Sequence, residues 1–412
     1  MEKPEIRFKG YTDEWEQRKL GDLVDRVTRK NQDLVSELPL TISAQYGLID
    51  QNEFFDKRVA SKDVSGYYLI ENGEFAYNKS TSTDAPWGAI KRLDRYENGV
   101  LSTLYIIFGI KENNPVDSDF LVSYYSTNLW HKGIHEIAAE GARNHGLLNI
   151  APADFFETKL MIPQDIEEQK KIGKYFEELE RLITLHQRKC DEVKTLKKYM
   201  LQKMFPQNEQ KVPEIRFEGF TEAWEQRKLE DYLEVSSEKN RDELLGKEDV
   251  LSVSGEVGIV NQIEFQGRSF AGVSVANYGI VEVGDVVYTK SPLKSNPYGI
   301  IKTNKGKTGI VSTLYAVYKP KKNVDSEFVQ IYFESDFRMN SYMHPLVNKG
   351  AKNDMKVSDA NALKGPVFFP KIEEQIVISQ YFNSLDHLIT LHQQKCEELK
   401  KIKKFMLQKM FV

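Results

Sequence analysis

Residues 182–205 have the sequence LITLHQRKCDEVKTLKKYMLQKMF, and residues 388–411 have the sequence LITLHQQKCEELKKIKKFMLQKMF. The two stretches are identical at 18 of 24 positions. From just before each stretch, residues suited to a helix seam recur at alternating intervals of four and three, in the first copy at Ile172, Phe176, Leu179, Ile183, His186, Cys190 and Val193. This spacing predicts two long helices, over residues 166–204 and 372–410, that pair as a coiled coil.

The beginning of each half is also repeated. Residues 4–20 and 213–229 are identical at 13 of 17 positions, including the segment P-E-I-R-F. Between the repeated ends the halves diverge, and only short matches survive, such as Y-N-K-S with Y-T-K-S and S-T-L-Y with S-T-L-Y. A duplicated enzyme would keep its catalytic residues inside the inserts. A constant frame around two variable inserts therefore favours a duplicated recognition protein.

The inserts are rich in short strand-like runs. Val283–Tyr288 and Ile310–Tyr318 are β-branched and aromatic, which predicts strands, and helical pieces are expected near Ser118–Asn128 and Ser326–Asp336. We predict an α+β protein with two pseudo-symmetric strand-rich domains separated by two long antiparallel helices that form a coiled coil. The expected division is a frame segment and first domain over 1–164, a central helix over 165–206, a second frame segment and domain over 207–370, and a C-terminal helix over 371–412.

The bulk composition limits the class of protein. There is no apolar run of about 18 residues and no apolar leader, so we expect a cytoplasmic protein that does not bind membranes. The two cysteines are too few for a disulfide framework or a zinc site. A net charge of −4 is unusual for a protein that binds nucleic acid. However, residues 286–324 contain eight lysines and no acidic residue, which predicts a local basic face.

The ordered motifs together resemble the specificity subunits of type I restriction-modification systems. The matching signals are P-x-I-R-F-x-G…W…L before each insert, G-[AST]-x-N late in each insert, and P-x-x-I-E-E-Q at the start of each closing helix, at Pro163–Ile172 and Pro370–Ile378. The second helix start departs from this pattern, because Pro370 stands only two residues before Ile372. The resemblance covers essentially the whole chain, and the motif order occurs twice.

The resemblance implies a subunit that recognises a bipartite sequence in double-stranded DNA, with one half-site for each target-recognition domain. It implies that the helices set the half-site separation and, with the frame segments, dock two methyltransferase subunits, and that restriction subunits join the full complex. It also implies that this chain binds no cofactor itself. S-adenosylmethionine, ATP and Mg²⁺ are expected on the partner subunits.

Candidate DNA-contact residues lie in polar loops and strand ends of the inserts. Lysine, serine and threonine are suited to phosphate, and asparagine and arginine to base edges. The alternative for any one of them is an ordinary turn residue. The candidates are Lys79, Ser80, Ser82, Thr83, Arg92, Arg143, Asn144, His145, Lys290, Ser291, Lys294, Asn296, Lys302, Lys352 and Asn353.

The sequence carries no convincing catalytic motif. Asn296-Pro297-Tyr298 lacks the second proline of the loop with which amino-methyltransferases hold the target amine, and no phosphate-binding loop or paired metal-ligand set occurs. We therefore predict a non-catalytic protein with no metal site. The competing hypothesis from another class is a coiled-coil scaffold whose globular domains bind protein.

Overall fold

The computed structural model describes residues 3–43, 46–83, 85–112, 116–138, 146–207, 210–293, 296–349 and 355–412. The chain divides into two compact units. Unit 1 comprises Met1–Gln187 with Gln394–Val412, and unit 2 comprises Arg188–Gln393. Each unit therefore joins one strand-rich insert to part of both long helices, whereas the four segments expected from the sequence follow the order along the chain.

Unit 1 is built on a four-stranded antiparallel sheet in the order β2-β9-β6-β7, accompanied by the strand pairs β1-β10, β3-β4 and β5-β8. Its elements are β1 (Glu16–Lys19), α1 (Leu20–Leu23), β2 (Val24–Val27), β3 (Leu40–Ser43), β4 (Gly47–Asp50), α2 (Gln51–Phe55), β5 (Tyr68–Glu71), β6 (Phe75–Asn78), β7 (Ala89–Arg92), β8 (Asn98–Leu101), β9 (Ile106–Ile110), α3 (Ser118–Tyr124), α4 (Leu129–Ile137), α5 (Pro152–Phe156) and β10 (Lys159–Ile162).

Unit 2 repeats this plan with the sheet β12-β19-β16-β17 and the pairs β11-β22, β13-β14, β15-β18 and β20-β21. Its elements are β11 (Glu225–Lys228), η1 (Leu229–Asp231), β12 (Leu233–Val235), η2 (Lys247–Asp249), β13 (Leu251–Ser254), β14 (Gly258–Asn261), α7 (Gln262–Gln266), β15 (Gly279–Val281), β16 (Val286–Thr289), β17 (Ile301–Thr303), β18 (Gly309–Val311), β19 (Tyr315–Pro320), α8 (Ser326–Phe333), α9 (Asp336–Met343), β20 (Asn348–Lys349), β21 (Met355–Lys356), η3 (Asn361–Leu363) and β22 (Pro366–Phe369).

The central strands of the two sheets have equivalent registers. Tyr77 lies opposite Ile106 in unit 1, and Tyr288 lies opposite Ala316 in unit 2. All four side chains are buried in the core of their unit. The strand-rich α+β prediction is confirmed. The expectation of one strand over Ile310–Tyr318 is wrong, because a turn separates β18 from β19.

The closing segments form two long helices, α6 (Ile166–Lys203) and α10 (Ile372–Lys409), each of 38 residues. At 1.5 Å per residue each helix is about 57 Å long. The predicted antiparallel coiled coil is confirmed, because contacts fall in reverse order along the two helices within each unit. These contacts are Glu180–Lys403 and Gln187–Cys396 in unit 1, and Cys190–Ile389 and Lys197–Asp386 in unit 2.

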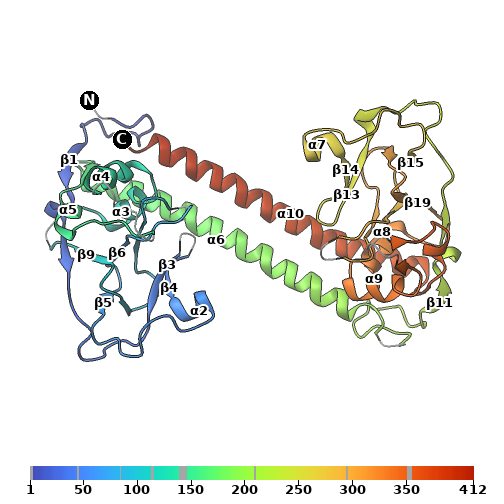
Figure 1. Ribbon diagram of the computed structural model, residues 1–412, viewed down its shortest axis with the longest axis horizontal. Helices are drawn as coiled ribbons and strands as arrows, with labels where there is room; N and C mark the ends of the chain where they lie inside the picture. The colour runs from blue at the N-terminus through green and yellow to red at the C-terminus, as the bar shows by residue number, and fades with distance from the viewer. Residues whose placement is uncertain are drawn as a thin grey trace. The chain divides into compact units, whose positions relative to one another are not determined.

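Each frame segment closes its unit against the end of a long helix. The Ile6 amide donates to the Lys409 carbonyl at 2.9 Å, and the Ile215 amide donates to the Lys203 carbonyl at 3.0 Å. These bonds satisfy carbonyls that a helix end otherwise leaves without a partner. In unit 1 the start of the chain accordingly lies beside the end of α10 (Figure 1). The Trp15 ring packs there against Phe411, at 6.0 Å between centroids.

Candidate nucleic-acid interface

A lysine directly follows one of the two inner strands of each four-stranded sheet. Lys79 follows β6, and Lys290 follows β16. Continuing the strand register places Lys79 opposite Leu104 and Lys290 opposite Leu314. The Lys290 amide donates to the Leu314 carbonyl at 3.2 Å. Both units thus present the same lysine–leucine pair at one end of the sheet.

In unit 1 the loop after Lys79 presents hydroxyl groups to solvent. Ser80, Ser82 and Thr83 are exposed. The loop is held by Thr81, whose amide and hydroxyl donate to the Gly146 carbonyl at 2.7 and 3.1 Å. The structure therefore brings four of the predicted unit 1 residues together beside the end of β6.

Several predicted residues lie outside the described ranges. Three of them immediately precede Gly146 in the sequence. The residues outside the described ranges are Arg143, Asn144, His145, Lys294, Lys352 and Asn353.

The Lys79 side chain is partly buried. It donates to the Ile150 carbonyl at 3.4 Å. Burial, followed by the positive charge of Arg26, lowers the pKa of Lys79. A phosphate oxygen nearby would favour the charged form and raise this pKa again.

The corresponding cation in unit 2 already has an internal partner. Lys290 pairs with Asp359 at 2.9 Å, with both side chains partly buried. Asn296 donates to the Asp336 carboxylate at 2.6 Å. Ser291, which directly follows Lys290, is partly exposed. A phosphate that binds Lys290 would have to compete with Asp359.

Arg92 and Lys302 are engaged inside their units. Arg92 pairs with Asp94 at 2.6 Å and with Asp119 at 2.7 Å. Lys302 is 9% exposed and pairs with Glu334 at 3.3 Å. Both side chains are more buried than that of Lys290: Arg92 is 17% exposed and Lys302 is 9% exposed, compared with 23% for Lys290.

The basic face that the sequence predicts over residues 286–324 is not formed as expected. Of the seven lysines that the structure describes in this window, four pair with carboxylates: Lys290, Lys302, Lys305 and Lys319. Lys319 has three acidic partners, which raise its pKa although burial opposes the shift. The carboxylates come from flanking segments, so the local count of lysines overstated the surface charge.

The I-E-E-Q motif at each helix start has a structural role that sequence analysis missed. Glu168 accepts two hydrogen bonds from Arg7, and Glu374 is paired in the same way with Arg216. The next residue, Gln169, is fully buried, accepts from the Asp117 amide at 2.8 Å and donates to a carbonyl of the preceding turn. The motif therefore fastens the frame segment and the insert to the helix.

The last third of each long helix carries an exposed apolar pair. Leu196 and Tyr199 lie on α6 within unit 2, and Ile402 and Phe405 lie on α10 within unit 1. A spacing of three residues places both members of a pair on one helix face. The exposed fractions run from 37 to 50%, which is high for large apolar side chains next to a packed seam.

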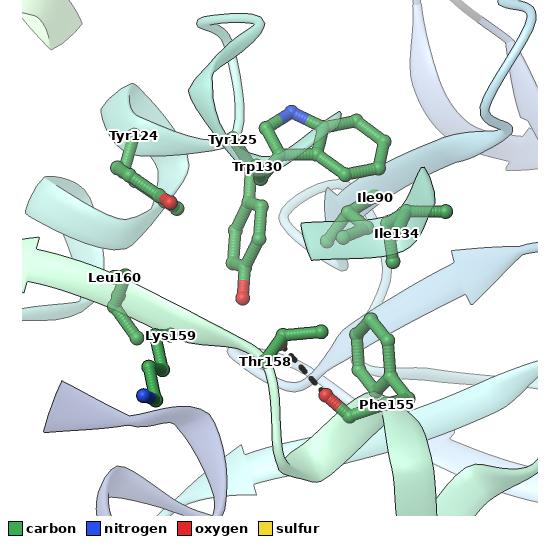
Figure 2. Close-up of a pocket in the computed structure, with 9 residues that line it drawn as sticks. All are labelled: Ile90, Tyr124, Tyr125, Trp130, Ile134, Phe155, Thr158, Lys159 and Leu160. Carbon is green, nitrogen blue, oxygen red and sulfur yellow. Dashed lines mark hydrogen bonds between the residues drawn. The ribbon is translucent and has the colours of Figure 1, made fainter. Parts of the chain in front are cut away.

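Unit 1 contains a small cavity with an aromatic lining (Figure 2). Tyr124, Tyr125 and Trp130 line one side, and Thr158, which donates to the Phe155 carbonyl at 2.7 Å, lies on the other. The cavity volume is ≈ 10 Å³. This is about the space that a single water needs, so the cavity is too small for a nucleoside cofactor.

Within the described ranges, no group of three or more metal-ligating side chains comes together. The same part of the chain has no helix whose length and apolar character would allow it to cross a membrane.

Comparison with known proteins identifies this architecture. Residues 12–195 match the family described as the type I restriction modification DNA specificity domain. A putative type I restriction enzyme specificity subunit, MjaX, of Methanocaldococcus jannaschii is 22% identical over 95% of this chain and 91% of its own length. The crystal structure of a type I restriction-modification S subunit from M. genitalium superposes with a TM-score of 0.59 at 13% identity, covering 100% of this chain and 99% of that one. The resemblance predicted from the repeated motifs is confirmed.

Proposed function

We propose that this chain, whose residues 12–195 match the family described as the type I restriction modification DNA specificity domain, recognises a bipartite DNA sequence. Unit 1 recognises one half-site and unit 2 the other. The observation that carries the proposal is the equivalent sheet end in both units, where Lys79 and Lys290 stand beside loops of different sequence. Lysine is suited to phosphate, and the polar loops are suited to base edges.

The helices α6 and α10 then set the separation of the half-sites. Both are continuous over about 57 Å and pair through a packed seam, so they resist bending more than a flexible linker would. A fixed helix length corresponds to a fixed number of unread base pairs between the half-sites.

Two methyltransferase subunits dock on the helices. This part of the proposal is supported by the exposed pairs Leu196–Tyr199 and Ile402–Phe405, which occupy equivalent positions in the two units. Exposed apolar side chains on a surface helix are typical of protein interfaces. One pair in each unit fits two copies of one partner.

The chemistry of the complex belongs to the partner subunits. In the proposed division of roles, methyltransferase subunits bind S-adenosylmethionine, and restriction subunits use ATP and Mg²⁺ to act on DNA. In this division of roles the chain supplies the sequence specificity and its partner subunits supply the catalysis.

Methylome sequencing of a host that expresses this chain with its methyltransferase partner tests the proposal. We expect a bipartite methylated motif that disappears when the chain is deleted and the methyltransferase alone is expressed. A methylated motif that does not depend on this chain would contradict the proposal.

One observation favours the alternative of a scaffold whose globular domains bind protein, namely the internal pairing of Lys290, Lys302, Lys305 and Lys319. That alternative predicts that deleting the inserts abolishes a protein contact and leaves DNA methylation unchanged. The same methylome experiment, repeated with an insert deleted, distinguishes the two functions.

A further inference from the structure

A turn with the sequence Ser-Thr-Leu-Tyr occupies the same position in both units. It covers Ser102–Tyr105 in unit 1 and Ser312–Tyr315 in unit 2. The tyrosine amide donates to the serine carbonyl at 3.1 Å in unit 1 and at 3.0 Å in unit 2. The turn is the same in the two units although the surrounding inserts differ, and it adjoins the lysine that follows the central strand.

Two of the four residues have a structural reason to be there. The serine carbonyl closes the turn. The tyrosine side chain is partly buried and packs against an apolar cluster: Tyr105 against the cluster that contains Leu40 and Ile107, and Tyr315 against the cluster that contains Leu251 and Val317. These contacts account for the retention of serine and tyrosine.

The other two residues point away from the core. Leu104 is 53% exposed and Leu314 is 63% exposed, and the threonine before each of them is exposed as well. The tip of a surface turn usually carries Gly, Asn, Asp, Ser or Pro, because these residues suit the turn geometry and water. A leucine therefore stands at the exposed tip of the turn in both units, where it is available for a contact outside the chain.

The surroundings of the leucine indicate what it meets. Leu314 stands beside Lys290 across the end of the β16–β19 pair, and Leu104 stands opposite Lys79 in the same register. An exposed threonine and an exposed leucine thus lie beside a partly buried lysine at the end of two adjacent strands. These strands are the inner pair of a four-stranded sheet, so the turn at their end would make the contact. The apolar group on the base edges of the major groove of B-DNA is the C5-methyl of thymine.

We propose that Leu104 and Leu314 each contact a thymine methyl group, one in each half-site, while the adjacent lysine binds the DNA backbone. This inference rests on the proposed function. It predicts that each half-site contains an A·T pair whose thymine methyl is required, because the same apolar tip occurs in both units. The loops on either side, which differ between the units, then distinguish the remaining bases.

The test uses the full chain in complex with its methyltransferase partner and duplexes that carry the methylated motif. Each thymine of the motif is replaced in turn by deoxyuridine, which removes only the methyl group. For the wild-type complex, one replacement in each half-site should weaken binding by about three- to tenfold, the effect of removing one well-packed methyl group.

The variant Leu314→Ala should lose a similar factor on the thymine duplex and show no further loss with deoxyuridine in its half-site, while the other half-site responds as in the wild type. Leu104→Ala should do the same for the first half-site. Leu244→Ala, which truncates an 87% exposed leucine elsewhere in unit 2, is the matched control and should behave as the wild type.

Three outcomes overturn the inference. They are an equal deoxyuridine effect in Leu314→Ala and the wild type, a half-site in which no thymine replacement matters, and loss of the methyltransferase subunits from the Leu314→Ala complex in gel filtration without DNA. The last outcome would identify the leucine as a protein contact. If the wild-type complex instead showed no sequence-specific binding at all, the proposed function itself would fail together with this inference.

Discussion

The Arg7 guanidinium binds the Glu168 carboxylate through two hydrogen bonds, of 2.6 and 2.8 Å, across 161 residues of sequence. The carboxylate is only 1% exposed. Unit 2 repeats the contact between Arg216 and Glu374, with both bonds at 2.7 Å. A buried ion pair therefore fixes the frame segment to the helix start in each unit.

Arg7→Ala should lower the free energy of unfolding by about 3–5 kcal/mol, because it leaves a buried carboxylate without its cation. Urea denaturation of the full chain measures the change. Arg18→Ala, which removes the partner of Glu16, whose side chain is 39% exposed, is the control and should change stability by less than about 1 kcal/mol. A similarly small loss in Arg7→Ala would show that the pair does not anchor the frame.

Equivalent lysines in β7 and β17 differ in their partners. Lys302 pairs with Glu334, the C-cap residue of α8. At the position that corresponds to Glu334, unit 1 has Ser126, which offers Lys91 no carboxylate. Burial, followed by the positive charge of Lys403, lowers the pKa of Lys91 from 10.5. The unfolded chain therefore holds the Lys91 proton more tightly than the folded one, and stability should rise with pH in the window between the lowered pKa and 10.5.

Methionine at these two positions should consequently have opposite effects. Lys91→Met should raise the free energy of unfolding at pH 7 by up to about 1 kcal/mol, and this gain should shrink as the pH approaches 10.5. Lys302→Met should lower it by about 1–3 kcal/mol, because buried Glu334 loses one cation. Denaturation at several pH values measures both changes. The same sign for both variants would contradict the assignment of the partners.

The regular parts of the fold could be predicted from the sequence because they depend on local periodicity. The seam of α6 and α10 follows from the alternating spacing of four and three, and the repeated frame follows from direct identity. The prediction of one strand over Ile310–Tyr318 was wrong. β-branched residues flank Ser312–Leu314 on both sides, so the local pattern does not indicate the turn between β18, which pairs with β15, and β19, which pairs with β16.

The candidate site was predictable only in part, for an electrostatic reason. Lys79 and Lys290 could be found from the repeated K-S dipeptide, because it follows a strand-like run in both halves. The partners of the lysines could not, because Asp359 and Glu334 lie outside the lysine-rich window and only the fold brings them into it. Leu104 and Leu314 were not among the predicted residues, because their solvent exposure cannot be read from the sequence.

The proposed phosphate contact of Lys290, which is paired with Asp359, predicts opposite effects of two substitutions on DNA binding. Lys290→Ala should weaken binding of the complex about evenly across sequences and lower the slope of log affinity against log salt by about 1, as expected for a phosphate contact. Asp359→Asn should strengthen binding, because it frees the lysine. Titrations at several salt concentrations measure both effects, with Lys305→Ala, whose partner is Glu327, as the control. If Asp359→Asn weakened binding, Lys290 would not be the phosphate contact.

The exposed helix pairs predict how many partner subunits bind. Leu196→Asp and Ile402→Asp should each remove one methyltransferase subunit from the complex, and the double variant should remove both, because each introduces a charge into one apolar contact. Native mass spectrometry counts the subunits. Thr195→Asp adds the same charge at an exposed neighbouring position and should leave both subunits bound. A full complement in the double variant would place the docking surface elsewhere.

The measurement that tests the central claim most directly is the methylome of a chimera. Residues 21–160 are replaced by the equivalent segment of a relative with a different target, and the chimera is expressed with the same methyltransferase. One half of the methylated motif should change, while the other half and the spacing between the halves stay as in the wild type. A motif that changed in both halves, or in neither, would contradict the account that each unit recognises its own half-site.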